Sequence, residues 1–178
     1  MPDGDEEEEP PRRILEENKE LRTQVDHLRA LERERKRVSK LLARAGAGFT
    51  GPLRLGRSGL GWPVAGHSVV SGFGQRWGRL HAGIDIVART GDPIRAAADG
   101  LVVIAGPTGG YGHYVCVQHT RALTTCYAHL SRYLTKKGIK VAQGDPIGLV
   151  GCTGHCLGEH LHFETWVSGR PVDPMRFF

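Results

Sequence analysis

The first pattern along the chain is a charged, amphipathic stretch that contains neither glycine nor proline. Apolar residues recur in it at alternating steps of four and three, with one asparagine in the same series. These positions are Ile14, Asn18, Leu21, Val25 and Leu28, followed after a three-residue shift by Leu31, Val38 and Leu42. The spacing predicts an α-helix over residues 14–45 whose apolar seam forms a coiled coil, with Asn18 fixing its register. A single solvated helix that acts as a spacer is the alternative.

The segments on either side of this helix have the composition of unfolded chain. Residues 1–13 are acidic and then basic, with two adjacent prolines, and are predicted to be disordered. Residues 46–61 are rich in glycine and form a predicted linker. We therefore assign residues 62–178 to one folded domain.

Within residues 62–178, short runs of apolar and β-branched residues alternate with glycine-containing turns. The predicted strands are 69–70, 83–87, 101–105, 114–118, 124–128, 147–150 and 161–167. This spacing predicts a mainly β fold, a compact antiparallel β-sandwich or barrel-sandwich preceded by one long helix. The tetrapeptide at Gly91–Ile94 recurs at Gly144–Ile147, which suggests two related β-hairpin units.

Composition narrows the class of protein. The 24 Lys and Arg residues exceed the 19 Asp and Glu residues, so the formal charge is +5, which favours anionic surroundings. No basic-aromatic stripe or nucleic-acid module is present, so nucleic acid is not an expected partner. No apolar run reaches the roughly 18 residues that a transmembrane helix requires.

The compartment follows from two conflicting signals. The acidic start differs from the basic start of a signal peptide. Four cysteines, in contrast, are compatible with two disulfides and an oxidising compartment. We expect a secreted or cell-surface protein whose export signal is not in this chain, and a cytosolic protein with free thiols is the alternative.

Three separate strand segments carry histidines of metal-binding type. His81 and Asp85 lie four residues apart at the start of an apolar run, where a carboxylate is costly unless it is paired or bound to metal. His160 and His162 are two residues apart on one predicted strand and therefore share a face, and His129 ends another strand. Three nitrogen and oxygen ligands with an open position are typical of catalytic zinc.

Each of these segments also has a purely structural explanation. An exposed strand can carry two histidines without function, His81 and Asp85 can stabilise a turn, and His129 can cap a strand end. The remaining histidines are interpreted as ordinary residues of the helix, a turn, a hairpin end and a loop; they are His27, His67, His119 and His155.

The order of these segments resembles the LytM/lysostaphin-type zinc metalloendopeptidases. The resemblance rests on His81-x-x-x-Asp85, Tyr127-Ala128-His129-Leu130-Ser131 and His160-Leu161-His162-Phe163-Glu164, with flanking matches at 71–74, 97–100, 109–112 and 172–174. It covers residues 62–178. It implies a β-sandwich with an open groove, one zinc ion held by His81, Asp85 and His162, and His129 and His160 as the catalytic pair. The implied substrates are the peptide cross-bridges or stem peptides of bacterial peptidoglycan.

The chemistry of the residues agrees with this resemblance. Zinc lowers the pKa of bound water from about 15.7 toward 7. We favour His160 as the general base and His129 as the donor to the oxyanion, and the reverse assignment stays open. Two positions depart from the family pattern: His113 replaces a common Asn, where we expect a groove contact or a further metal ligand, and Glu159 replaces a usual Pro.

Within the same frame, the cysteines form two close pairs. Cys116 and Cys126 are expected on the two arms of one hairpin, and Cys152 and Cys156 bracket the loop that leads to His160. The alternative is a zinc site made of Cys152, Cys156 and His155.

Two other functions are compatible with parts of the pattern. Coiled-coil relatives of these peptidases include non-catalytic activators of other cell-wall hydrolases, which lack ligand or catalytic histidines. Two histidines and a carboxylate also describe the facial triad of non-haem iron oxygenases. The complete set of five residues favours the peptidase. The sequence does not specify which bond is cut, or whether the helix binds itself or a partner helix.

Overall fold

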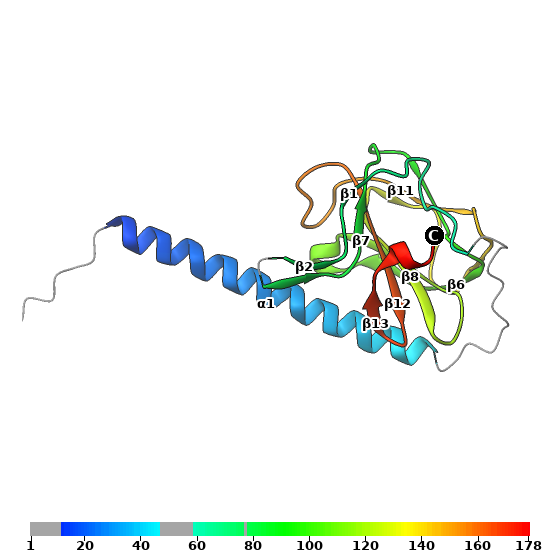
Figure 1. Ribbon diagram of the computed structural model, residues 1–178, viewed down its shortest axis with the longest axis horizontal. Coiled ribbons are helices and arrows are strands. Elements are labelled where there is room, and N and C mark those ends of the chain that lie inside the picture. Colours follow the sequence, from blue (N-terminus) through cyan, green and yellow to red (C-terminus); the bar gives the residue numbers. More distant parts are fainter. Residues whose placement is uncertain (1–11, 47–58, 77) are drawn as a thin grey trace, which may run out of the picture.

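The computed structural model describes residues 12–46, 59–76 and 78–178. One long helix, α1 (Arg12–Gly46), runs past a β domain made from the rest of the chain (Figure 1). The predicted helix is confirmed, whereas residues 1–11 of the predicted tail and residues 47–58 of the predicted linker lie outside the described residues. Among the described residues, no helix has the length and apolar character needed to cross a bilayer.

Antiparallel pairing organises the β domain. Its main sheet has the order β1 (Val69–Ser71), β4 (Ile84–Ile86), β12 (Leu161–Val167), β8 (Leu123–Leu130), β7 (His113–Gln118), β6 (Gly100–Pro107) and β10 (Lys140–Val141), with β13 (Arg170–Val172) on β12. The other strands are β5 (Pro93–Arg95), β11 (Pro146–Leu149) and β9 (Arg132–Tyr133) in one sheet, and β2 (Gly74–Arg76) and β3 (Arg79–His81) in another. Two 3₁₀ turns, η1 (Gly109–Tyr111) and η2 (Pro174–Arg176), complete it. All seven predicted strands are present, which confirms the mainly β fold.

Side-chain alternation divides the apolar residues between two faces of the main sheet. On β7, Val115 and Val117 pack into a core that also contains Ile94 of β5 and Ile147 of β11. The main core therefore lies between the main sheet and the three-stranded sheet. Tyr114 and the other alternate residues of β7 face the opposite side, as the two-residue period of a strand requires.

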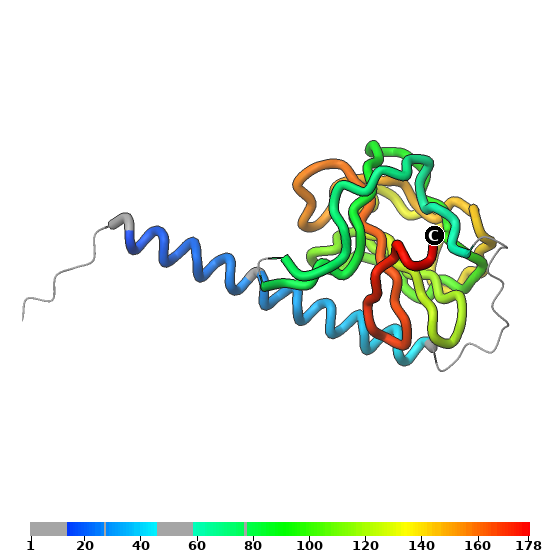
Figure 2. The backbone as a smooth tube through the Cα atoms, viewed as in Figure 1, coloured from blue at the N-terminus to red at the C-terminus, as the bar shows by residue number. Residues whose placement is uncertain are grey.

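Helix α1 covers this second face. Val38 and Leu42 are buried there in one cluster with Tyr114, Trp166 and the cysteines of β7 and β8. Ser39 Oγ donates a hydrogen bond of 2.6 Å to the carbonyl of Gly169, between β12 and β13. The C-terminal half of α1 runs alongside the β domain (Figure 2). The seam residues of this half, Val38 and Leu42, thus pack on the sheet.

The N-terminal half of the same seam is solvent-exposed in the folded chain. Ile14 is 45% exposed, Leu21 is 59% exposed and Leu28 is 40% exposed. The helix projects beyond the β domain over this part (Figure 1). A coiled coil formed by these residues stays a prediction.

Both cysteine pairs form disulfides. Cys116 and Cys126 are directly opposite each other on β7 and β8, and Cys152–Cys156 closes the loop before β12. A zinc site at Cys152, Cys156 and His155 is therefore wrong, because the two sulfur atoms are bonded to each other.

The repeated tetrapeptide builds one strand pair instead of two hairpins. β5 and β11 each begin at the proline of a repeat and pair with each other in antiparallel register. Asp92 accepts a bond from the Arg89 amide, and Asp145 accepts the matching bond from Ala142, both at 2.8 Å. Two similar turns thus face each other, and each places a buried isoleucine in the main core.

We predict that Leu42→Ala lowers the free energy of unfolding by about 2–5 kcal/mol, because it removes buried side-chain volume between α1 and the sheet. The matched change Leu21→Ala, in the exposed half of the same helix, is expected to stay within about 0.5 kcal/mol. Urea unfolding of both variants measures the difference. Equal and small effects would show that α1 does not pack on the sheet in solution.

His119 is not the ordinary hairpin-end residue that the sequence suggested. Its side chain is 1% exposed, with Nδ1–H donating to the carbonyl of Asp99 (2.8 Å) and Nε2 accepting from the Thr125 hydroxyl (2.7 Å). Burial lowers the pKa of His119 to about 4. The ring is therefore neutral at pH 7.

This pKa predicts a pH-dependent stability. The folded protein resists protonation of His119 and the unfolded chain does not, so stability is lost as the pH falls below about 6.5. Between pH 7 and pH 5 the loss from this residue is about 2 kcal/mol. The difference in free energy of unfolding between the wild type and His119→Gln should therefore be smaller at pH 5 than at pH 7 by that amount. Urea unfolding with chelator present measures this difference. A constant gap would contradict the prediction.

Candidate metal centre

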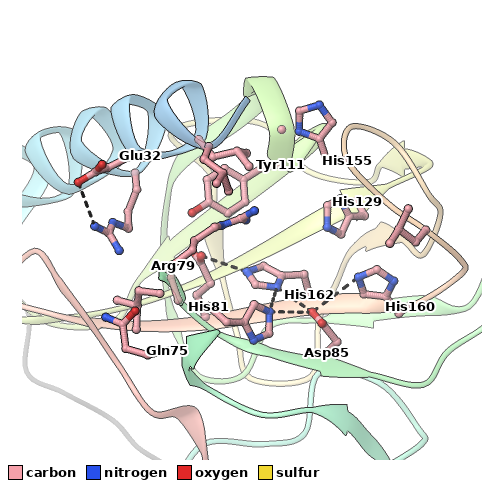
Figure 3. A pocket seen from close by; sticks show the side chains of 18 of the residues that line it. Glu32, Gln75, Arg79, His81, Asp85, Tyr111, His129, His155, His160 and His162 are labelled. Carbon is pink, nitrogen blue, oxygen red and sulfur yellow. Dashed lines mark hydrogen bonds and ion pairs between the residues drawn. The ribbon is translucent and has the colours of Figure 1, made fainter. Parts of the chain in front are cut away.

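Three predicted ligands converge at one end of the main sheet (Figure 3). His81 ends β3, Asp85 lies in the middle of β4, and His162 is directly opposite Asp85 on β12. Asp85 Oδ1 is 3.2 Å from His81 Nε2 and 2.8 Å from His162 Nδ1, and the two nitrogens are 3.1 Å apart. The pairing of β4 with β12 thus brings together residues that are 77 positions apart in the sequence.

These atoms fit a divalent metal. A tetrahedral zinc site with bonds of about 2.0–2.1 Å places its ligand atoms roughly 3.3 Å apart, close to the separations of the three atoms. Two imidazoles and one carboxylate are also the ligand types of a catalytic site that keeps an open position. The residues present therefore fit a metal ion such as zinc.

The close approach of β4 to β12 depends on Gly83. A Cβ atom at this position would lie 2.3 Å from the carbonyl oxygen of Phe163 and 2.9 Å from Cγ of Glu164. Any larger residue would separate the strands that carry Asp85 and His162. The close contact between the strands thus explains why position 83, between the first two predicted ligands, is a glycine.

A buried carboxylate orients His162 from behind. Glu164 is 0% exposed, and its Oε1 accepts a hydrogen bond from His162 Nε2–H at 3.1 Å. Its Oε2 accepts from the Tyr114 hydroxyl (2.6 Å) and from Trp166 Nε1–H (2.8 Å). The resulting carboxylate–histidine pair fixes the ring so that Nδ1 faces the metal position.

Sequence reasoning did not assign Glu164 to the site. The signal was present, because Glu164 follows His162 by two residues and shares its face of the strand. What the sequence lacked was any sign that Tyr114, fifty positions earlier, supplies a further donor.

The two carboxylates and His162 shift one another's pKa values. Burial raises the pKa of Asp85, but hydrogen bonds to His162 and His81 lower it well below its usual range. Burial likewise raises the pKa of Glu164, but its hydrogen bond to His162 lowers the pKa. The net result is a pKa below the ordinary value. Burial lowers the pKa of His162, but bonds to Asp85 and Glu164 raise it to about 9. A bound metal would replace the proton at His162 Nδ1.

The predicted catalytic pair lies beside these ligands. The ring centroids of His129 and His160 are 5.0 Å apart, and His160 Nε2 is 3.6 Å from Asp85 Oδ1. His129 Nδ1–H donates to the carbonyl of Thr153 (2.8 Å), and His160 Nδ1–H donates to the carbonyl of Gly158 (2.7 Å). Because a carbonyl only accepts, each neutral ring keeps its proton on Nδ1 and has a free electron pair on Nε2.

His129 is held in an unusual conformation. Its φ of 63° lies in the left-handed region, which side chains other than glycine rarely adopt. Burial lowers the pKa of His129 to about 4, and the nearby charge of His162 lowers it too. The ring is neutral at pH 7, and backbone strain of this kind is concentrated at functional sites.

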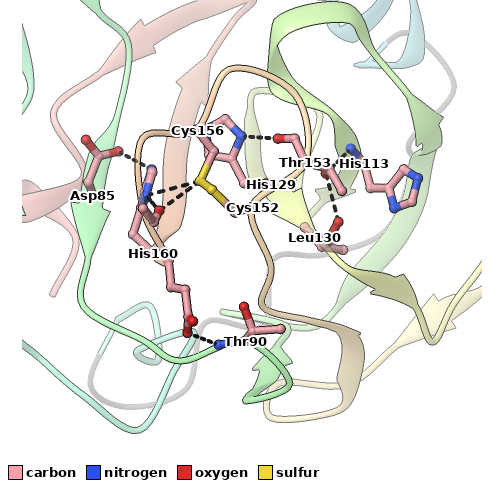
Figure 4. Close-up of a disulfide and its surroundings, with 11 residues drawn as sticks. Asp85, Thr90, His113, His129, Leu130, Cys152, Thr153, Cys156 and His160 are labelled. Atoms are coloured by element: carbon pink, nitrogen blue, oxygen red, sulfur yellow. Dashed lines mark hydrogen bonds and ion pairs between the residues drawn. A yellow bond between two sulfur atoms is a disulfide. The ribbon is translucent and has the colours of Figure 1, made fainter.

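The disulfide loop completes the site from one side (Figure 4). Thr153, inside this loop, supplies the carbonyl that holds His129, and its hydroxyl donates to the Leu130 carbonyl at 2.8 Å. Gly158, two residues after Cys156, supplies the carbonyl that holds His160. Glu159, which replaces the usual proline, accepts a hydrogen bond from the backbone N–H of Thr90 at 2.6 Å. This bond connects the segment before β12 to the chain that follows β4.

His113 does not have the role expected of it. Its ring packs against Tyr133, with the centroids 4.8 Å apart, and it is not among the residues that line the cleft or form the ligand group. Both the groove contact and the further metal ligand expected of it are therefore wrong.

Comparison with known proteins gives one consistent result. The model of Peptidase family M23 matches residues 79–174. The peptidoglycan DD-endopeptidase ShyA of Vibrio cholerae is 45% identical over 96 residues, which are 54% of this chain and 22% of ShyA. The DD-carboxypeptidase/endopeptidase Mpg of Neisseria meningitidis is 42% identical over 120 residues, which are 64% of this chain and 27% of Mpg. The chain thus spans about a quarter of the length of these curated relatives.

Solved structures agree. A zinc-containing peptidase from Vibrio cholerae superimposes with a TM-score of 0.63 and 38% identity, over 67% of this chain and 40% of that one. Lysostaphin from Staphylococcus simulans gives a TM-score of 0.60 and 28% identity, over 69% of this chain and 54% of that one. These matches agree with the resemblance that the order of motifs predicts.

We predict that Glu164→Gln weakens metal binding by about 10–100-fold, the usual effect of removing a carboxylate behind a ligand histidine. Glu159→Gln is the matched control, because it removes a nearby carboxylate that contacts a backbone amide and no ligand. Competition with a chromogenic chelator measures both affinities. Equal affinities in the two variants would exclude an orienting role for Glu164.

Proposed function

The chain belongs to peptidase family M23, and we propose that it is a zinc-dependent endopeptidase that hydrolyses peptide bonds in bacterial peptidoglycan. The observation that carries the proposal is the convergence of the ligand set His81, Asp85 and His162 with His129 and His160 in one cleft. The substrate class is supported by the similarity to ShyA, a peptidoglycan DD-endopeptidase.

In this proposal the metal position is formed by His81 Nε2, Asp85 Oδ1 and His162 Nδ1. Zinc supplies Lewis-acid chemistry there: it lowers the pKa of a water molecule that it binds and polarises a carbonyl group. His81 is oriented for this task by its own Nδ1–H, which donates to the Gly72 carbonyl at 2.7 Å. The similar peptidase from Vibrio cholerae contains zinc, which supports this choice of metal over iron.

His160 is the proposed general base. Its Nδ1–H is occupied by the Gly158 carbonyl, so the electron pair on Nε2 is directed to the side where Asp85 lies. A neutral imidazole in this position can take a proton from the attacking water and return it to the leaving amine. The carbonyl bond keeps the ring in the tautomer that this transfer needs.

His129 is the proposed donor to the developing oxyanion. Its lowered pKa means that Nε2 carries no proton in the resting protein at pH 7. His129 can donate only after its Nε2 has taken up a proton from solvent, and a negative charge that forms beside the ring favours this uptake because it raises the pKa of His129. His129 thus acts late, whereas His160 acts first.

The setting of the site supports action outside the cytoplasm. Two disulfides are typical of secreted and cell-surface proteins, and cell-wall substrates lie outside the membrane. We propose that residues 62–178 form the domain that carries the catalytic site. We also propose that the exposed half of α1 associates with another helix. The non-catalytic activator is less favoured, because all five site residues are present and converge.

Digestion of purified sacculi tests the proposed function. The wild type should release new amino termini in a chelator-sensitive way. His162→Ala should lose both metal and activity, and His160→Ala should keep the metal while its rate falls by about 10²–10⁴-fold. His67→Ala, an exposed histidine outside the cleft, is the control and should match the wild type. Mass spectrometry of the fragments identifies the bond, and bound metal without any release would favour the activator.

A further inference from the structure

Helix α1 forms one wall of the cleft that contains the metal centre. The cleft has a volume of about 510 Å³ and is lined on one side by His81, Asp85 and the other site histidines. The opposite lining includes Leu28, Leu31, Glu32 and Arg35, all from α1. Figure 3 shows Glu32 on the helix and Arg79 between the helix and the histidines.

The position of this wall is fixed by packing. Glu34 Oε2 accepts the backbone N–H of Gly110 at 2.8 Å, which joins the helix to η1. A Cβ atom on Gly110 would lie only 2.3 Å from Leu31 Cδ2, so the helix and the turn are already in close contact. One turn further along, Val38 is buried against the sheet. The residues of α1 next to the cleft therefore belong to the folded structure.

Arg35 occupies a special place on this helix. It lies between Leu31 and Val38 in the apolar seam, so it points toward the β domain where most of the seam is apolar. Its side chain is 28% exposed, and its ion pair with Glu32 is 3.8 Å long while Glu32 itself is 55% exposed. The pair is thus weak and leaves the guanidinium available in the cleft.

Arg79 adds a second positive charge from the other side of the cleft. Within the described part of the chain, it forms no hydrogen bond or ion pair with another side chain. Arg35, Arg79 and Tyr111 all line this one cleft. Burial and Glu164 raise the pKa of the Tyr111 hydroxyl, and the two guanidinium charges oppose that rise. Arg35 and Arg79 thus bring two positive charges to the same cleft.

We propose that Arg35 and Arg79 form a subsite that binds a free carboxylate of the substrate peptide next to the bond that is cut. The inference rests on the proposed function and names the part of the substrate that the cleft recognises. Guanidinium groups bind carboxylates through charge-assisted, often bidentate hydrogen bonds. In a partly enclosed cleft these contacts are screened less than on an open surface.

Glu32 makes the subsite adjustable. Its carboxylate lies within 4 Å of Arg35 and of Lys36, so it competes with a substrate carboxylate for Arg35. Removal of this negative charge should therefore strengthen the subsite, and removal of Arg35 should weaken it. Opposite effects from two neighbouring residues on one helix are not expected from a general loss of stability.

Two soluble cross-linked peptides that differ only by a free carboxylate or a carboxamide beside the scissile bond test the subsite. For the wild type, kcat/KM should be higher for the free acid. In Arg35→Gln and Arg79→Gln that preference should fall about 5- to 10-fold, mainly through KM, as expected for a partly screened charged hydrogen bond. In Glu32→Gln the preference should rise.

The control is Arg29→Gln on the same helix, since Arg29 is 67% exposed, pairs with Asp26 and does not line the cleft. It should keep the wild-type preference. Equal cleavage of both peptides by the wild type, or an equal loss on both peptides in Arg35→Gln, would overturn the subsite.

Binding separates this inference from the proposed function. If no variant cleaves either peptide, the endopeptidase proposal fails, and calorimetric titration of the metal-loaded His160→Ala protein with the same two peptides still reads the subsite. Tighter binding of the free acid, lost when Arg35→Gln is added, would uphold it. Equal binding of the two peptides would reject it.

Discussion

The hydrogen bonds of the buried Glu164 carboxylate connect the separate parts of this molecule. A carboxylate that is 0% exposed is stable only with full compensation, and Glu164 receives it from His162, Tyr114 and Trp166. His162 is one of the proposed metal ligands, while Tyr114 and Trp166 also belong to the apolar cluster that Val38 of α1 covers. The candidate metal centre and the docked helix therefore lie on the same face of the sheet and share these side chains, so a change at one affects the other.

The local chemistry of the site was readable from the sequence because a strand has a period of two. His162, Glu164 and Trp166 follow one another at that spacing on β12, so their common face is a property of the sequence alone. The disulfide between Cys116 and Cys126 was readable for a similar reason, since a hairpin places its arms opposite each other. The convergence of β4 and β12 was supplied by the family resemblance and not by any local pattern.

The parts that sequence reasoning missed depend on long-range contacts. An apolar seam such as Leu31, Val38 and Leu42 is equally suited to a second helix and to the face of a sheet, so the coiled-coil pattern did not reveal the docking of α1. His119 was interpreted as an ordinary hairpin-end residue because nothing near it in the sequence indicates that the carbonyl of Asp99 accepts its hydrogen bond. In both cases the contact is made with a residue far away in the sequence, which only the folded structure brings close.

Charge balance explains why the helix wall matters to the cleft. A divalent cation at the ligand set would be neutralised by the negative charges of Asp85 and Glu164, since the histidines around it are neutral as ligands or bases. Among the residues that line the cleft, the base then carries no net charge. The field that a substrate meets is therefore set by the walls, where Arg35 and Arg79 outweigh Glu32. A helix outside the β domain thus contributes the charge that distinguishes one peptide from another, while the strands contribute the chemistry.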